Sequence, residues 1–235
     1  MSIELYLAAA AVCILIGLIG RIGLRMASDN EDMISWAKTL TPALLCGMPL
    51  AVLQSGFEWM EGGSQTFLCI TSLGAALGVG AIIDRETGWA PDILMAVLAA
   101  NGMLLGTIIA GWELSPIVAS IVGIALLAVI NLFWIAAVKL TGSCAILPPA
   151  DILAFALPFM IFGISAQFVT VMLVIATVGL ACKRVPSIAA IFTNPKVGEK
   201  IVREIESDDM KEGHGLTLLS IALPSTWLAI MIWLN

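Results

Sequence analysis

Long apolar stretches separated by short polar segments run through the whole chain. An α-helix that crosses a membrane needs about 20 consecutive apolar residues, and several stretches approach or reach that length. The candidate spans are residues 3–24, 39–57, 66–83, 92–111, 115–138, 152–164, 166–182 and 215–234. The pattern predicts an all-α fold: one membrane-embedded domain, residues 1–235, built as a polytopic bundle of about eight transmembrane helices.

Composition supports the same class of protein. Hydrophobic residues make up 60% of the chain and charged residues only 12%. This small number of polar side chains cannot cover a water-facing surface. We therefore expect an integral membrane protein surrounded by the lipid bilayer. The first apolar stretch has no basic residue before it and no small-residue cleavage site after it. We therefore expect a retained helix there, and not a signal peptide.

The two short stretches 152–164 and 166–182 decide the topology. Together they are too short for two full-length crossings and too long for one untilted helix. If both cross, all eleven Lys and Arg residues lie on one side of the membrane. A single crossing would move six of them to the other side: Lys183, Arg184, Lys196, Lys200, Arg203 and Lys211. The positive-inside rule therefore favours two short helices, broken and turned at Pro158 and Gly163, with a cytoplasmic connector at about 183–214.

Candidate chemistry lies in two carboxylate-bearing segments between predicted spans. The first is Asp84-Arg85-Glu86-Thr87-Gly88-Trp89-Ala90-Pro91-Asp92, and the second is Leu147-Pro148-Pro149-Ala150-Asp151-Ile152. Ionisable groups at the ends of membrane-spanning segments are costly to bury and usually serve catalysis or transport. Asp84 ends the third predicted span and Asp151 opens the sixth. We therefore expect both carboxylates at the cytoplasmic end of the bundle, where they can face each other.

A pair of facing carboxylates suits hydrolysis. Repulsion between like charges raises the pKa of one member, so near neutral pH one is protonated and the other ionised. The ionised member takes a proton from water while the protonated member assists the carbonyl and the leaving amine. No metal or cofactor is expected, because His214 is the only histidine and the five cysteines form no C-x-x-C pair.

These residues resemble a known family. Asp84, five further residues, and then Ala90-Pro91-Asp92-Ile93-Leu94 is similar to the D-x5-I-P-[N/D]-x-L signature of type IV prepilin peptidases, membrane aspartyl proteases related to archaeal preflagellin peptidases. The resemblance implies that Asp84 is catalytic. Ala150-Asp151-Ile152 falls at the place of the second motif of the family, G-x-[G/A]-D-[I/V]-K, which implies Asp151 as the second catalytic residue. Pro148 and Leu153 stand where that motif has Gly and Lys.

The resemblance implies an aspartic-type endopeptidase of the bacterial inner (plasma) membrane. Its expected partner is a prepilin-like protein, a pilin or pseudopilin of type IV pili or type II secretion, whose leader it removes at the cytoplasmic face; no nucleic acid is expected. The loop 26–38 lacks the C-x-x-C pairs of many bacterial members. Their N-methyltransferase activity, and with it S-adenosylmethionine as a cofactor, is therefore left open, as are the substrate, the oligomeric state and the base and acid roles.

Other interpretations remain. The same carboxylates could serve a small cation- or proton-coupled transporter, and the changes at Pro148 and Leu153 suit a scaffold that has lost catalysis. Asp84 could be only a helix-end carboxylate. Asp92 is assigned to capping the next helix, Asn101 to a hydrogen bond between helices, and the glycines at 74, 78 and 80 to close helix packing.

Overall fold

The computed structural model describes most of the predicted spans. The described residues are 2–27, 35–55, 63–87, 90–109, 149–163, 166–192 and 218–234, with isolated positions at 118, 121, 125 and 132. All regular structure in these ranges is helical, in eight helices without a strand. The prediction of an all-α fold is confirmed for this part of the chain. The predicted span 115–138 and most of the connector 183–214 lie outside the described residues.

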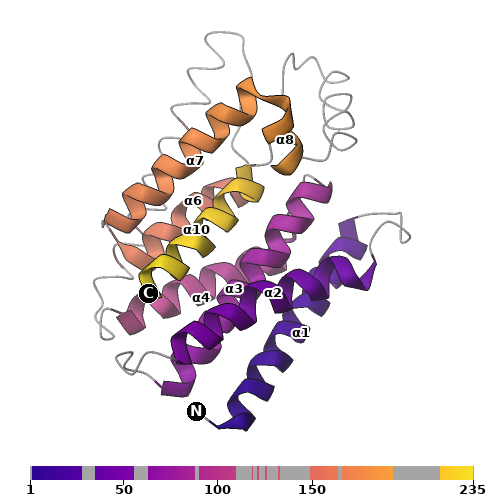
Figure 1. Cartoon of the computed structure of the whole chain (residues 1–235), viewed down its shortest axis with the longest axis vertical. Coiled ribbons are helices and arrows are strands. Elements are labelled where there is room, and N and C mark those ends of the chain that lie inside the picture. Colours follow the sequence, from indigo (N-terminus) through magenta and orange to yellow (C-terminus); the bar gives the residue numbers. More distant parts are fainter. Residues whose placement is uncertain are drawn as a thin grey trace.

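The helices begin and end close to the predicted spans. Their bounds are α1 Ile3–Ala27, α2 Trp36–Ser55, α3 Gly63–Thr87, α4 Asp92–Ile109, α6 Pro149–Phe162, α7 Ala166–Arg184, α8 Pro186–Phe192 and α10 Leu218–Leu234. Figure 1 shows α7 joined to the short α8 at the upper end of the molecule. Helix α8 lies inside the predicted connector, and the sequence pattern gave no indication of it.

The sequence predicts that Pro158 and Gly163 break the chain, and the structure confirms this for Gly163 only. Pro158 does not interrupt the chain, because it lies inside α6. Helix α6 ends at Phe162, and the next residue, Gly163, has a φ of +61°. A left-handed residue just after a helix is the usual way in which such a helix ends, and glycine adopts it without steric cost. Gly163 therefore ends α6 at this point.

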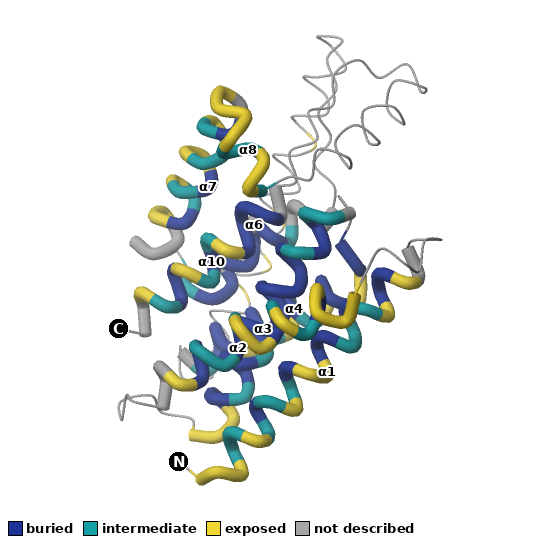
Figure 2. Tube along the Cα trace, turned by 45° about the vertical axis from the view of Figure 1, so that its right-hand side comes forward, coloured by how far each residue is buried: buried dark blue, intermediate teal, exposed yellow. Residues whose placement is uncertain are grey.

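Helix α3 is the centre of the bundle. It contacts α1, α2, α4 and α10, and Figure 2 shows it buried through most of its length. Its glycines allow this close approach, as predicted. A Cβ on Gly78 would lie 2.8 Å from the Pro42 carbonyl oxygen of α2, and one on Gly80 would lie 2.8 Å from Leu223 Cδ1 of α10. The glycines therefore let α3 pack closely against both α2 and α10.

Glycines also fix how α4 and α6 run past each other. A Cβ on Gly102 would lie 2.5 Å from Leu157 Cδ1, and one on Gly106 would clash with the Met160 carbonyl oxygen. Residue numbers thus increase in the same direction along both helices at their contact. The two helices are parallel, so the first residues of α6 lie at the same end of the bundle as the first residues of α4.

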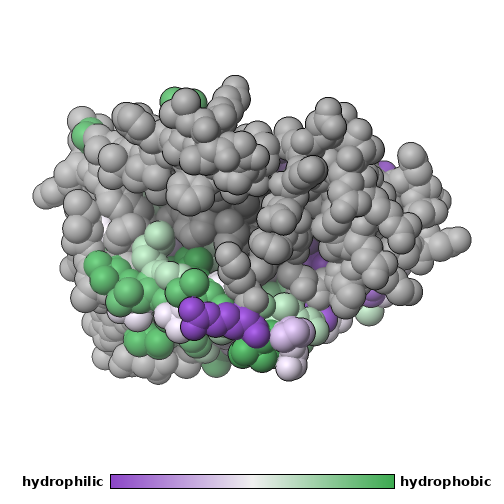
Figure 3. Space-filling view, turned by 90° about the horizontal axis from the view of Figure 1, so that it is seen from above, coloured by the Kyte–Doolittle hydropathy of each residue, from purple (hydrophilic) through white to green (hydrophobic). Residues whose placement is uncertain are grey.

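Two of the described helices are long and apolar enough to cross a membrane by length and composition, Ile3–Arg25 and Gly63–Glu86. Shorter apolar helices cover Asp92–Ile108, Val169–Cys182 and Ser220–Ile232. Helix α1 leaves large apolar side chains exposed, among them Ile3 at 78% and Leu7 at 66%. Seen from above, hydrophobic side chains lie beside a few hydrophilic ones on the same face (Figure 3).

Candidate functional site at the end of the central helix

Asp84 is buried at the C-terminal end of α3, with 3% of its surface exposed. Its Oδ2 accepts a hydrogen bond of 2.7 Å from the backbone N–H of Ser220. Ser220 is the third residue of α10, and the first N–H groups of a helix have no partner within that helix. The carboxylate therefore satisfies one of these donors and lies at the positive end of the dipole of α10.

Ser220 also forms a hydrogen bond with a third helix, α8. The Ser220 hydroxyl donates a hydrogen bond of 2.7 Å to the carbonyl oxygen of Phe192, the last residue of α8. Both Ser220 and Asp84 are buried. Ser220 thus joins the end of α8 to the start of α10, and its N–H joins both to the buried Asp84 at the end of α3. Ser220 was missed in the sequence analysis, because a serine within an apolar stretch carries no local sign of such a contact.

Charged and aromatic side chains surround this end of α3. Lys38 Nζ of α2 lies 2.9 Å from Glu86 Oε2, and both side chains are partly exposed. The Arg21 guanidinium of α1 lies 3.5 Å from the centre of the Trp36 ring, a cation–π contact between α1 and α2. Arg85 Nε is buried and has no hydrogen-bond partner among the described residues. Basic groups therefore outnumber acidic ones around Asp84 on α1, α2 and α3.

The sequence predicts that Asp92 caps α4, but the structure places it inside the helix as its first residue. The backbone N–H groups of Leu94 and Met95 both donate to the Pro91 carbonyl, at 2.9 and 3.0 Å. Pro91 is therefore the residue whose carbonyl starts the helix, and Asp92 is the first residue inside it. Asp92 is exposed and stabilises the helix through its charge in the first turn. It remains a structural residue, as predicted, and is not part of the buried site.

Asp151 is the third residue of α6, and the parallel run of α4 and α6 places its backbone at the Asp84 end of the bundle. Leu157 of α6 and Gly102 of α4 are in contact and therefore lie at the same level of the bundle. Asp151 lies six residues before Leu157, whereas Asp92 lies ten residues before Gly102. At a rise of about 1.5 Å per residue, the backbone of Asp151 is roughly 6 Å deeper in the bundle than that of Asp92. The side chain of Asp151 lies outside what the structure describes, so its pairing with Asp84 stays a prediction.

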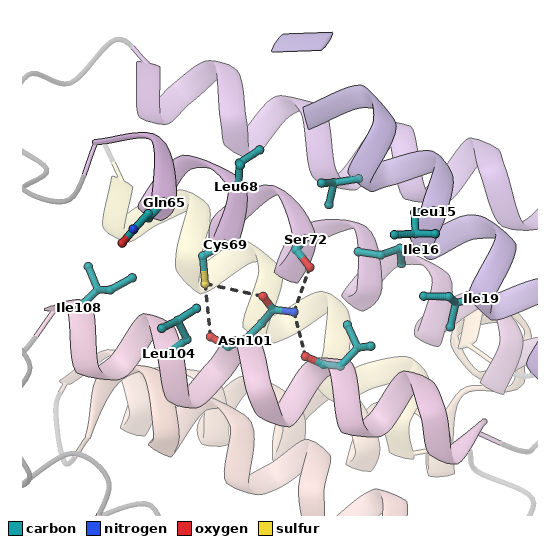
Figure 4. Close-up of a pocket in the computed structure, with 12 residues that line it drawn as sticks. Leu15, Ile16, Ile19, Gln65, Leu68, Cys69, Ser72, Asn101, Leu104 and Ile108 are labelled. Atoms are coloured by element: carbon teal, nitrogen blue, oxygen red, sulfur yellow. Dashed lines mark hydrogen bonds between the residues drawn. The ribbon is translucent and has the colours of Figure 1, made fainter. Parts of the chain in front are cut away.

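A groove of about 490 Å³ opens between α1, α3 and α4. In this groove Asn101 Nδ2 donates hydrogen bonds to Ser72 Oγ at 2.9 Å and to the Val97 carbonyl at 2.8 Å (Figure 4). The predicted hydrogen bond of Asn101 between helices is confirmed. Ser72 lies twelve residues before Asp84, or about 18 Å along the helix. This apolar groove is therefore separate from the carboxylates.

Metal ligands do not cluster in the described ranges, which hold no group of three or more His, Cys, Asp or Glu side chains. His214 and Cys144 lie outside those ranges. The cysteines at 13, 46, 69 and 182 are free thiols. The absence of a metal from the proposed chemistry thus remains an expectation from the sequence.

Comparisons with protein-family models, with curated proteins and with solved structures find no match to this chain.

Proposed function

We propose that this chain is a membrane-embedded aspartyl endopeptidase of the bacterial inner membrane that removes the leader of prepilin-like proteins at the cytoplasmic face. The observation that carries the proposal is Asp84, a carboxylate with 3% of its surface exposed at the end of the central helix. A buried ionisable group at a helix end is a typical feature of a functional site. The motif around it resembles that of the prepilin peptidases.

The surface of the bundle supports a polytopic membrane protein of about eight spans. Large apolar side chains are exposed on several helices, for example Leu45 at 65%, Leu173 at 62% and Ile232 at 65%. Exposed apolar side chains spread over so many helices suit lipid better than water. Basic residues such as Arg25, Lys38 and Arg184 lie on helix ends, and the positive-inside rule assigns those ends to the cytoplasm.

The proposed reaction is hydrolysis of one peptide bond by the pair Asp84 and Asp151. The ionised member takes a proton from water, and the water oxygen forms a bond to the peptide carbonyl carbon. The protonated member hydrogen-bonds the carbonyl oxygen as negative charge develops there. When the C–N bond breaks, the amine nitrogen takes a proton from the aspartate pair, and the products are the free leader and the mature protein with a new N-terminus.

A transporter is less well supported by the place of Asp84. Coupling carboxylates of transporters lie near the bilayer midplane at broken helices. Asp84 lies instead three residues before Thr87, the last residue of α3, and α3 carries no proline. The carboxylate is thus at the end of a continuous helix, which suits a substrate that arrives from the aqueous face.

Co-expression tests the proposal. The chain is produced in a bacterial host together with a prepilin that carries its leader, and the leader is followed by gel mobility and mass spectrometry. We expect the leader to be lost only when this chain is present. If several pilin and pseudopilin precursors stay intact beside a well-accumulated, membrane-inserted chain, the peptidase assignment is wrong.

A further inference from the structure

The N-terminus of α10 binds Asp84 through a backbone donor, the N–H of Ser220. The Ser220 N–H lies 2.7 Å from Asp84 Oδ2, and no charged residue occurs anywhere in α10. We infer that Ser220 is a positioning residue of the proposed peptidase: its N–H holds Asp84 as the ionised member of the pair, the base, which leaves the role of proton donor to Asp151. This inference rests on the proposed function and adds to it the division of roles between the two aspartates.

The geometry favours the ionised form of Asp84 for two reasons. An N–H that donates to a carboxyl oxygen stabilises the negative form more than the neutral one. The donor also belongs to a helix N-terminus, whose partial positive charge acts strongly where little water screens it, and Asp84 is almost fully buried. Both effects are larger for the carboxylate than for the protonated group, and they oppose the burial, which by itself favours the neutral form.

Nearby charges act in the same direction. The basic groups at this end are Arg21 and Arg25 on α1, Lys38 on α2, Arg85 on α3, and Lys183 and Arg184 on α7, and the acidic ones are Glu86 on α3, Asp92 on α4 and Asp151 on α6. Helices α8 and α10 contribute none. Glu86 is paired with Lys38 at 2.9 Å, and Asp92 is exposed. The remaining basic groups therefore favour a negative charge at Asp84.

The donor can be removed without touching a side chain of the pair. Ser220→Pro eliminates the N–H, and proline is tolerated in the first turn of a helix, where that N–H has no intrahelical partner. Ser220→Ala is the matched control, because it keeps the N–H and loses only the hydroxyl that donates to Phe192. Leu218→Pro is a second control, which places the same ring in the same turn and leaves the Ser220 N–H in place.

Two measurements read out the protonation of Asp84. The first is the pH profile of kcat/KM for cleavage of a prepilin leader. We expect Ser220→Pro to move the acidic limb upward by about one pH unit, with the basic limb unchanged and with both controls like the wild type. An acidic limb that stays in place in an active Ser220→Pro variant, or a shift of the basic limb in its stead, overturns the inference.

The second measurement does not depend on peptidase activity. Dicyclohexylcarbodiimide modifies protonated carboxyl groups in apolar surroundings, and mass spectrometry of the labelled full chain locates the adduct. In the wild type at pH 7 we expect the adduct on Asp151 and not on Asp84, with labelling of Asp84 only at lower pH and at a higher midpoint in Ser220→Pro. An adduct on Asp84 but not on Asp151 at pH 7 overturns the inference even if Ser220→Pro does not accumulate. A chain that shows the expected labelling but cuts no precursor refutes the peptidase proposal alone.

Discussion

Trp227 of α10 donates its indole N–H to the Cys46 carbonyl oxygen of α2, at 2.9 Å, across 181 positions of sequence. Pro49, three residues after the acceptor, lies inside α2 and lacks the N–H that would bond to the Leu45 carbonyl. In an apolar environment such a bond is costly to lose, because the carbonyl finds no water in its place.

The first prediction follows from that bond. Trp227→Phe keeps the aromatic ring but removes the donor, so we expect the free energy of unfolding to fall by about 1–2 kcal/mol. Leu228→Ala, at the adjacent and half-exposed position, is the control and should change it by less than about 0.5 kcal/mol. Unfolding in mixed detergent micelles, followed by circular dichroism, gives both values. Equal losses in the two variants would show that the indole N–H contributes nothing.

The second prediction concerns the contact between α4 and α6. Gly106→Ala places a methyl group against the backbone carbonyl of Met160, which cannot move aside without shifting α6, so we expect a loss of about 1–3 kcal/mol. Gly179→Ala is the control, because a Cβ there meets nothing within 4 Å and alanine favours a helix. The control should be neutral or slightly stabilising. Unfolding measurements in the same micelles decide, and a neutral Gly106→Ala would mean that α4 and α6 do not pack as described.

The third prediction tests the two aspartates. Asp84→Asn keeps an oxygen that can accept the Ser220 N–H but cannot exchange a proton, and Asp151→Asn has the same limitation. Each variant should insert and accumulate normally yet lose cleavage by at least about a thousandfold, since members of a catalytic unit fail together. Asp92→Asn, at an exposed position in the same motif, should keep most of the activity. Leader cleavage is measured by gel. Substantial activity in Asp151→Asn would remove that residue from the site.

The fourth prediction tests the topology. Cysteines introduced at Ser64, Lys38 and Arg184, all exposed, report on opposite ends of the bundle. A membrane-impermeant maleimide should label Ser64→Cys in spheroplasts, and Lys38→Cys and Arg184→Cys only after lysis, with the wild type as the blank. Labelling of Arg184→Cys from outside would mean that residues 152–182 cross once. The connector 183–214 would then lie on the opposite side of the membrane from Asp84 and Asp151.

The fifth prediction concerns methylation. Residues 26–38 carry no C-x-x-C pair, and the sequence has no Gly-rich nucleotide motif of the Rossmann type. We therefore expect the cleaved product to have a free N-terminal amine. Mass spectrometry of the N-terminal peptide measures this directly. A stoichiometric gain of one methyl group, retained when Asp84→Asn is supplied with precut substrate, would reveal a transferase site.

Local patterns determined most of the helices from the sequence alone. A helix and its hydrophobic run are set by neighbouring residues, so the spans ending near Asp84 and beginning near Asp92 were predicted within a few residues. Close packing at Gly78 and the hydrogen bond of Asn101 also followed, because glycine and asparagine have few other uses inside an apolar helix. The same local reasoning failed at Pro158, since neighbouring turns of α6 accommodate the ring, and it missed α8.

Only the tertiary structure decided what those helices bring together. Asp84 and Ser220 are 136 positions apart, and neither residue carries a local sign of the other. The burial of Asp84, its place on the N-terminus of α10 and the parallel run of α4 and α6 all depend on which helix packs against which. Those choices follow from the summed fit of many side chains across the bundle, a property that no window of sequence contains.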